Sequence, residues 1–122
     1  MTKKNQKFVS VDASVLGFKK DVPVLESNRN HILATEMQLI MADLDTKEYE
    51  DYRDMIQDYK EVIVKEVEFL KTTLKLDDKQ VEALYDLDQE ETTALIVEVI
   101  TKIMHIDMQA GEAEEETGTE DK

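Results

Sequence analysis

Apolar residues recur every three or four positions between residues 46 and 76, and neither glycine nor proline occurs among them. The stripe consists of Tyr49, Tyr52, Ile56, Tyr59, Ile63, Val67, Leu70 and Leu74. A mean spacing of about 3.6 residues is typical of an α-helix with one apolar face. We therefore predict one long helix over residues 46–76, which at about 1.5 Å per residue would be roughly 45 Å long. The other elements are expected to pack around it.

A second apolar stripe runs beside the first at seven-residue intervals, through Met55, Val62, Phe69 and Leu76. The C-terminal half of the long helix is therefore apolar over more than one face. Either this half is buried against two neighbours of its own chain, or the second stripe is a self-association surface. We take these four residues as the candidate protein-interaction residues. Because a chain with four helices has difficulty covering both stripes alone, we also predict a homo-oligomer.

Helix start signals place a first helix before the long one. Ser27 is expected to cap this helix, which should end near Asp43. Asp45 or Thr46 is then expected to cap the long helix, with Glu48 three residues after Asp45 as in a capping box. The predicted break between the two helices, residues 44–46, is so short that they form either an antiparallel pair or a kinked continuation.

Two further capping signals follow the long helix. Asp77 with Gln80, and Asp88 with Glu91, both match the capping-box spacing, and they predict a short third helix and a last helix over about residues 89–106. The centre of the last helix is apolar on nearly every face. This is typical of a helix in the middle of a bundle or at a subunit contact.

The two ends of the chain differ in composition from the helical region. The β-like alternation after Phe8 and the single proline, Pro23, predict an irregular or partly extended N-terminal arm. The C-terminal segment GEAEEETGTEDK has low complexity and six acidic residues, and we expect it to be disordered. The prediction is therefore a mainly α fold: an arm (residues 1–26), a small helical bundle around one long helix (27–108), and an acidic tail (109–122).

Charge and composition exclude several classes of protein. The chain has 29 acidic and 15 basic residues and a net charge of -14, which disfavours binding to nucleic-acid phosphates or to an anionic membrane. It has no cysteine, so disulfides, thiolate metal sites and cysteine nucleophiles are excluded. No apolar stretch approaches the roughly 18 residues of a membrane span, and none follows the N-terminal lysines as in a signal peptide. We expect a soluble intracellular protein.

Candidate catalytic and metal-binding residues are weak. His31 and His105 are the only histidines, and neither has a carboxylate three or four residues before it, as di-metal helical bundles do. The acidic spacing that begins at Asp86 resembles half of a calcium loop, but Glu91 stands where that loop needs glycine and Val97 where it needs glutamate. We therefore predict no catalytic, cofactor-binding or metal-binding residues, and no enzymatic activity.

A family resemblance comes from the second half of the chain, about residues 60–106. There the segment FLKTTLKL is followed by DDKQVEALYDLDQEETTALIVEVITKI. This half resembles the small helical tail assembly chaperones of long-tailed phages and prophages of Gram-positive bacteria. The resemblance implies a protein of the host bacterial cytoplasm that coats and solubilises the tape measure protein and helps tail tube subunits to polymerise around it. It also implies that the protein is absent from the mature virion.

The net charge supports an alternative hypothesis from a different class. An acidic protein can occupy the nucleic-acid-binding surface of a DNA-binding partner by imitating phosphate charge. Such a nucleic-acid mimic or regulatory protein would bind its partner in a salt-sensitive way.

Overall fold

The computed structural model describes residues 6–106 of the chain, and the acidic tail predicted for residues 109–122 lies outside this range. Its elements in chain order are β1 (Phe8–Val11), the 3-10 helix η1 (Ser14–Leu16), β2 (Val22–Leu25), α1 (Asn28–Thr46), α2 (Tyr52–Leu74), α3 (Asp78–Tyr85) and α4 (Gln89–Met104). The predicted mainly α fold class is confirmed.

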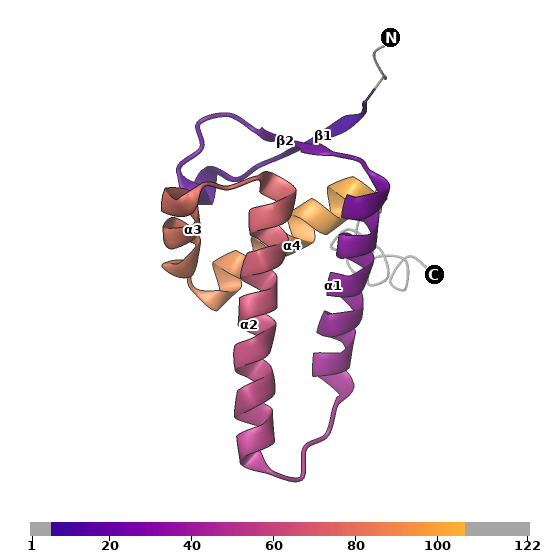
Figure 1. The fold of residues 1–122 in the computed structure, drawn as a ribbon, viewed down its shortest axis with the longest axis vertical. Helices are drawn as coiled ribbons and strands as arrows, with labels where there is room; N and C mark the ends of the chain where they lie inside the picture. The colour runs from indigo at the N-terminus through magenta and orange to yellow at the C-terminus, as the bar shows by residue number, and fades with distance from the viewer. Residues whose placement is uncertain (1–5, 107–122) are drawn as a thin grey trace, which may run out of the picture.

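The helices α1 and α2 form an antiparallel hairpin, with the connecting loop at its far end (Figure 1). α4 crosses the half of this hairpin that lies next to the strands, and it packs against α1, α2 and β1. α3 lies on the outer side of α2, and the two strands cover the end of the hairpin opposite to the loop. The loop-proximal halves of α1 and α2 therefore extend beyond the rest of the molecule.

The long helix begins later than the sequence predicted. Asp51 is its N-cap, and the carboxylate of Asp51 accepts a hydrogen bond from the backbone N–H of Arg53. Asp45 and Thr46 belong instead to the last turn of α1, where the Thr46 hydroxyl donates to the carbonyl of Ala42. The predicted cap at Asp45 or Thr46 and the predicted break at residues 44–46 are therefore wrong. The real link, residues 47–51, is long enough for the chain to reverse, which resolves the open alternative in favour of the antiparallel pair.

The other predicted caps are confirmed. Ser27 caps α1 by accepting from the backbone N–H of Asn30. Asp77 caps α3 and Asp88 caps α4, and both helices have complete capping boxes in which the side chain at the third position returns a bond to the N-cap backbone. Local hydrogen bonding thus fixes the starts of three helices, as expected from residue types whose oxygens satisfy free N–H groups.

α4 occupies the middle of the core. Its side chains Ile96, Val99, Ile100 and Ile103 have no solvent exposure. The sequence left open whether this helix lies inside a bundle or at a subunit contact, and the structure places it inside. Because α4 is apolar on most of its surface, it contacts α1, α2 and β1 at once.

The N-terminal arm is an antiparallel pair of strands that shares this core. Val9 pairs with Val24 and Val11 with Val22, and the side chains of Val11 and Val24 are fully buried. The amide of Asn30 donates to the carbonyl of Leu25, at 2.8 Å, and so joins the second strand to the start of α1. The strands and helices therefore form one packing unit.

Burial changes along α2. All of its buried side chains lie between Glu66 and its last residue, Leu74. In the first half, the side chains of Tyr52, Ile56 and Tyr59 are 70%, 49% and 48% exposed. The predicted apolar stripe is thus real, but only its C-terminal half is covered by the chain's own core, because α4 stops short of the loop (Figure 1).

Candidate interaction surface

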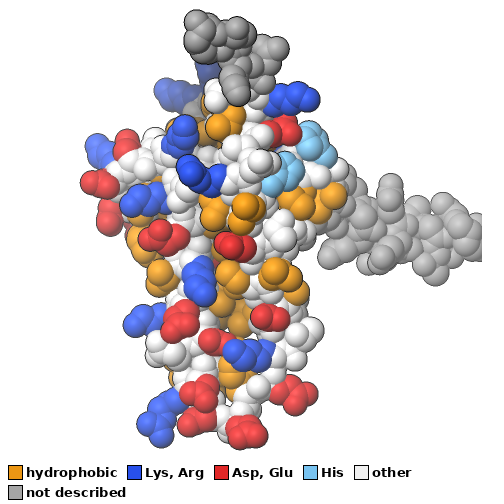
Figure 2. Space-filling model, turned by 45° about the vertical axis from the view of Figure 1, so that its right-hand side comes forward, with side chains coloured by type: hydrophobic (Ala, Val, Ile, Leu, Met, Phe, Trp, Pro, Cys, Tyr) orange, Lys and Arg blue, Asp and Glu red, His pale blue; other side chains and the backbone are white. Residues whose placement is uncertain are grey.

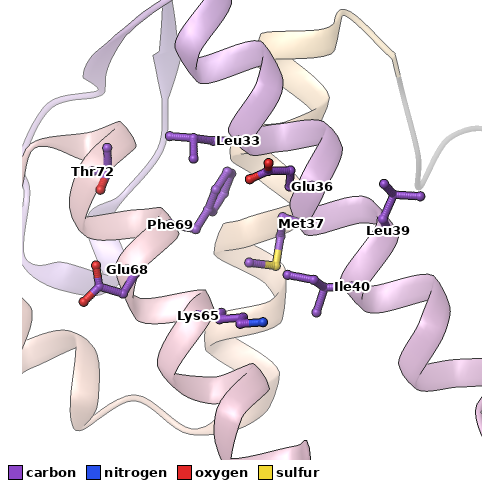
Figure 3. A pocket seen from close by; sticks show the side chains of 9 residues that line it. All are labelled: Leu33, Glu36, Met37, Leu39, Ile40, Lys65, Glu68, Phe69 and Thr72. Carbon is purple, nitrogen blue, oxygen red and sulfur yellow. The ribbon is translucent and has the colours of Figure 1, made fainter.

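A hollow lies between α1 and α2, lined by the sides of the two helices that face each other. Its volume is about 550 Å³, and its apolar lining consists of Leu33, Met37, Leu39, Ile40 and Phe69. Figure 3 shows Leu33 and Phe69 directed toward each other across the gap between the helices, and Leu39 directed away from it. The side chains of Met37 and Phe69 are almost fully buried, whereas Leu39 is 63% exposed. The hollow therefore has a buried apolar floor and is open to solvent on one side.

A second, smaller hollow of about 160 Å³ continues this surface toward the loop. It shares Ile40 and Lys65 with the first hollow and adds Leu44 from α1 and Val62 from α2. We call the two hollows together the α1–α2 groove. The groove extends from Leu33 to Leu44 along α1, which is about three helical turns or roughly 16 Å.

The edges of the groove carry an excess of negative charge. Five carboxylates line the two hollows, those of Glu36, Asp43, Asp58, Glu61 and Glu68, against two amines, those of Lys47 and Lys65. The amine of Lys47 is engaged by Asp58, with 2.8 Å between the two charged atoms. Figure 2 shows hydrophobic side chains exposed among charged ones over this part of the molecule. The groove thus combines an apolar floor with a negative rim.

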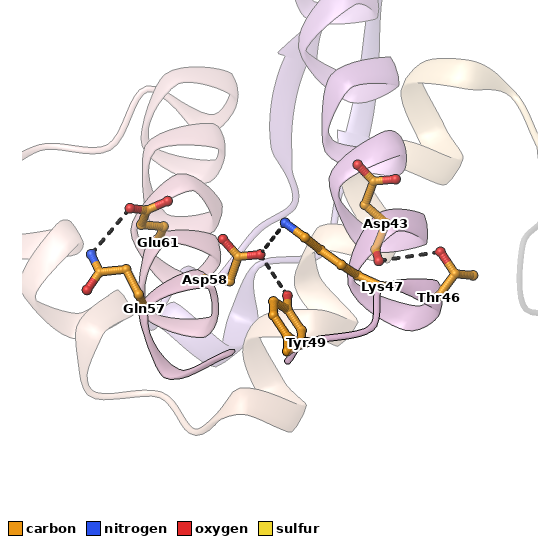
Figure 4. Close-up of polar contacts among 7 residues, drawn as sticks. All are labelled: Asp43, Thr46, Lys47, Tyr49, Gln57, Asp58 and Glu61. Atoms are coloured by element: carbon orange, nitrogen blue, oxygen red, sulfur yellow. Dashed lines mark hydrogen bonds and ion pairs between the residues drawn. The ribbon is translucent and has the colours of Figure 1, made fainter. Parts of the chain in front are cut away.

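A polar cluster closes the groove at the loop. The carboxylate of Asp58 accepts from the amine of Lys47 at 2.8 Å and from the hydroxyl of Tyr49 at 2.7 Å (Figure 4). These two hydrogen bonds lower the pKa of Asp58 below its usual value, and the same contacts raise the pKa of Lys47 and of Tyr49. The cluster ties the loop to α2 and so limits how far the two helices can separate at this end.

The four residues predicted as an interaction stripe lie in different environments. Phe69 lines the first hollow and Val62 the second. Met55 is 39% exposed on the same side of α2, one heptad closer to the loop. Leu76 lies beyond the end of the helix, after Lys75, and is buried in the core. The structure thus brings Val62 and Phe69 into one groove and separates Leu76 from them.

The opposite wall of the groove is not among the four residues predicted as the interaction stripe. It consists of Leu33, Met37, Ile40 and Leu44 on α1. Their spacing of four, three and four residues is the signal of a single helix face that could have identified them. The spacing does not show that this face lies against α2 with no third helix covering it.

Other polar residues are accounted for by structural contacts. Glu66 is buried between α2 and the start of α4, where the Gln89 amide donates to its carboxylate at 3.4 Å, and burial raises the pKa of the Glu66 carboxyl. The imidazole of His105 lies 2.7 Å from the carboxylate of Glu26. Within residues 6–106, no three histidine or acidic side chains come together in an arrangement that could hold a metal ion.

Comparison with known proteins adds no assignment. None of the family models, curated protein sequences or solved structures compared with this chain matches it. In the part of the chain that the structure describes, none of the helices combines the length and apolar character that crossing a membrane requires. The groove, the charge distribution and the sequence pattern are therefore the features of this chain that bear on its function.

Proposed function

We propose that this protein is a non-enzymatic tail assembly chaperone of a long-tailed phage or prophage, which binds the tape measure protein and keeps it soluble in the host bacterial cytoplasm. Assistance to tail tube assembly, and absence from the mature virion, belong to the same proposal. The observation that carries it is the open α1–α2 groove, and the resemblance of residues 60–106 supplies the identity of the client.

The groove suits a helical client. A tape measure protein is a long, helix-rich chain whose apolar faces must be covered before the tail tube is built around it. A groove with an apolar floor and polar edges can cover one face of such a helix by the helix-in-groove mode of recognition. Met37 and Phe69 provide the floor, and both are held in place by the core beneath them.

The charge of the chain fits the role of keeping a client soluble. Residues 6–106 contain 22 acidic and 12 basic residues, so the body remains strongly negative without the tail. Repulsion between negatively charged complexes opposes their aggregation. The exposed residues Tyr52, Ile56 and Tyr59 on the loop-proximal half of α2 are left for self-association, which we include in the proposal as a homo-oligomer.

Co-expression tests this function. The full chain is expressed together with the tape measure protein encoded in the same genome, and the soluble fraction of the tape measure protein is measured after centrifugation. We expect solubility and co-purification only when the full chain is present. A tape measure protein that remains insoluble in its presence would overturn the proposal.

A matched pair of variants connects this result to the groove. Thr72→Trp places an indole at the edge of the first hollow, whereas Thr35→Trp adds the same group at an exposed position of α1 that does not line it. We expect Thr72→Trp to reduce solubilisation of the tape measure protein and Thr35→Trp to leave it unchanged. Circular dichroism of both variants controls for folding.

The acidic-mimic hypothesis remains as an alternative because of one acidic segment. Residues 77–91 contain seven acidic residues and one lysine. Three of the seven, Asp77, Asp88 and Glu91, make capping hydrogen bonds, so their positions already have a structural reason. Binding to a DNA-binding protein that is displaced by DNA and weakened by salt would favour this alternative.

A further inference from the structure

We propose that the α1–α2 groove accepts a single amphipathic α-helix of another protein whose polar face is basic. This inference rests on the proposed function, because it specifies which kind of client segment the chaperone recognises. It is carried by three features of the groove: its length, its apolar floor and the sign of the charges at its rim.

The length of the groove fits about three turns of a bound helix. Leu33 and Leu44 mark its ends on α1. A helix of about eleven residues that lies along this distance presents three or four apolar side chains at spacings of three and four. The two hollows on either side of Ile40 offer separate places for these side chains, with the larger hollow near Phe69 suited to the bulkiest one.

The rim determines the charge of the occupant. With five carboxylates against two amines, a bound helix gains from lysine or arginine along its edges and loses from aspartate or glutamate. The carboxylates of Glu36 and Glu68 come from opposite walls, one from each helix, so basic residues on both edges of the client find partners.

The same charges argue against the chain itself as occupant. A second copy would bring another acidic body against an acidic rim. Residues 107–122 contain seven acidic residues and one lysine, so the tail has the wrong sign as well. Residues 1–5 include two lysines but only one apolar residue, Met1, which is too few to fill the floor. A basic helix from a different protein meets both requirements.

Synthetic peptides test this inference directly. A fluorescent peptide with leucines at helix-face spacing and lysines elsewhere is titrated with the full chain, and anisotropy reports binding. Two control peptides replace lysine by glutamate or scramble the order of the same leucines and lysines. We expect the basic amphipathic peptide to bind about tenfold more tightly than either control, and to lose affinity as salt is added.

Charge reversal at the groove identifies the site. The variant Glu36→Lys/Glu68→Lys reverses one carboxylate on each wall, and Asp21→Lys/Glu82→Lys makes the same change in net charge at exposed residues outside the groove. We expect the first variant to bind the basic peptide about tenfold more weakly and the second to bind almost as tightly as the unmodified chain. Equal weakening by both variants, or equal binding of the scrambled peptide, would overturn the inference, since either shows only general attraction to an acidic protein.

The inference and the proposed function can fail separately. If the tape measure protein is solubilised equally well by the chain and by Glu36→Lys/Glu68→Lys, and no peptide binds in the groove, the chain is a chaperone that uses another surface, and the groove inference fails. If the basic peptide binds with the expected specificity but the tape measure protein stays insoluble, the groove inference stands and the client is a different protein.

Discussion

Two isoleucines, one in the core and one in the helical hairpin, offer a matched test of which helix surfaces the chain buries itself. Ile100 lies in α4 with no solvent exposure, and Ile56 lies in the loop-proximal half of α2 with 49% of its surface exposed. Replacing each by alanine removes the same atoms. The only difference is the environment that loses them.

The expected costs differ several-fold. At Ile100, truncation removes buried contacts and leaves a cavity, which costs about 2–5 kcal/mol. At Ile56, about half of the transfer free energy of an isoleucine side chain, roughly 1 kcal/mol, is at stake. The better helix propensity of alanine returns a few tenths of a kcal/mol. We therefore expect Ile56→Ala to lower the free energy of unfolding by roughly 0.5 kcal/mol at a protein concentration too low for self-association.

Urea unfolding followed by circular dichroism measures both costs. With an m value of about 2 kcal/mol per M urea, a loss of about 3 kcal/mol moves the midpoint by roughly 1.5 M, whereas Ile56→Ala moves it by about 0.25 M. Repeating the titration at higher protein concentration tests self-association, because burial of Ile56 by a second copy would increase its cost while leaving that of Ile100→Ala unchanged. Equal costs for the two variants at every concentration would refute the assignment of an uncovered half of α2.

Three further predictions concern helix ends and a buried carboxyl. Lys75 ends α2 with a φ of 56°, so Lys75→Gly should raise the free energy of unfolding by about 0.5–1 kcal/mol, measured by urea titration; a loss would contradict the strain argument. Asp88→Ala removes the N-cap side chain of α4 and should lower the free energy of unfolding by about 1 kcal/mol in the same urea titration. Asp88→Asn should keep most of this stability, because asparagine is also a good N-cap residue. Burial raises the pKa of Glu66, so the unfolded chain releases this proton at lower pH than the folded chain. The stability that the protonated carboxyl contributes is therefore fully present below pH 4.5 and is lost as the pH rises through the folded pKa. Glu66→Gln, which keeps the contact to Gln89, should therefore be more stable than the unmodified chain at pH 7, and this gain should vanish below pH 4.5; a gain that is independent of pH would contradict the burial argument.

The sequence predicted those features of the fold that depend on neighbouring residues. The caps at Ser27, Asp77 and Asp88 follow from side chains that bond to N–H groups only three positions away, and all three are where the pattern places them. The same signal failed at Asp45, because several residues between 45 and 51 are equally good caps and only Asp51 is used. Tyr49 fits the apolar spacing of the long helix, yet it lies in the loop and its hydroxyl bonds to Asp58.

The sequence pattern predicted only one of the two walls of the groove, the one on α2, and the reason is geometric. The heptad spacing of Val62 and Phe69 identifies one wall of the groove, but the spacing says nothing of which neighbour covers that wall. Coverage depends on where α4 crosses the hairpin, and this is set by contacts between residues far apart in the chain. For the same reason, Leu76 belongs to the predicted stripe by spacing and to the core by position.

The most direct test of the central claim is hydrogen exchange of the full chain, measured by mass spectrometry, alone and in complex with the co-expressed tape measure protein. If the groove holds the client, exchange should slow in peptides that cover residues 33–44 and 58–72 and should change little in α3. Unchanged exchange in both groove segments, or protection confined to the acidic residues 77–91, would contradict the claim.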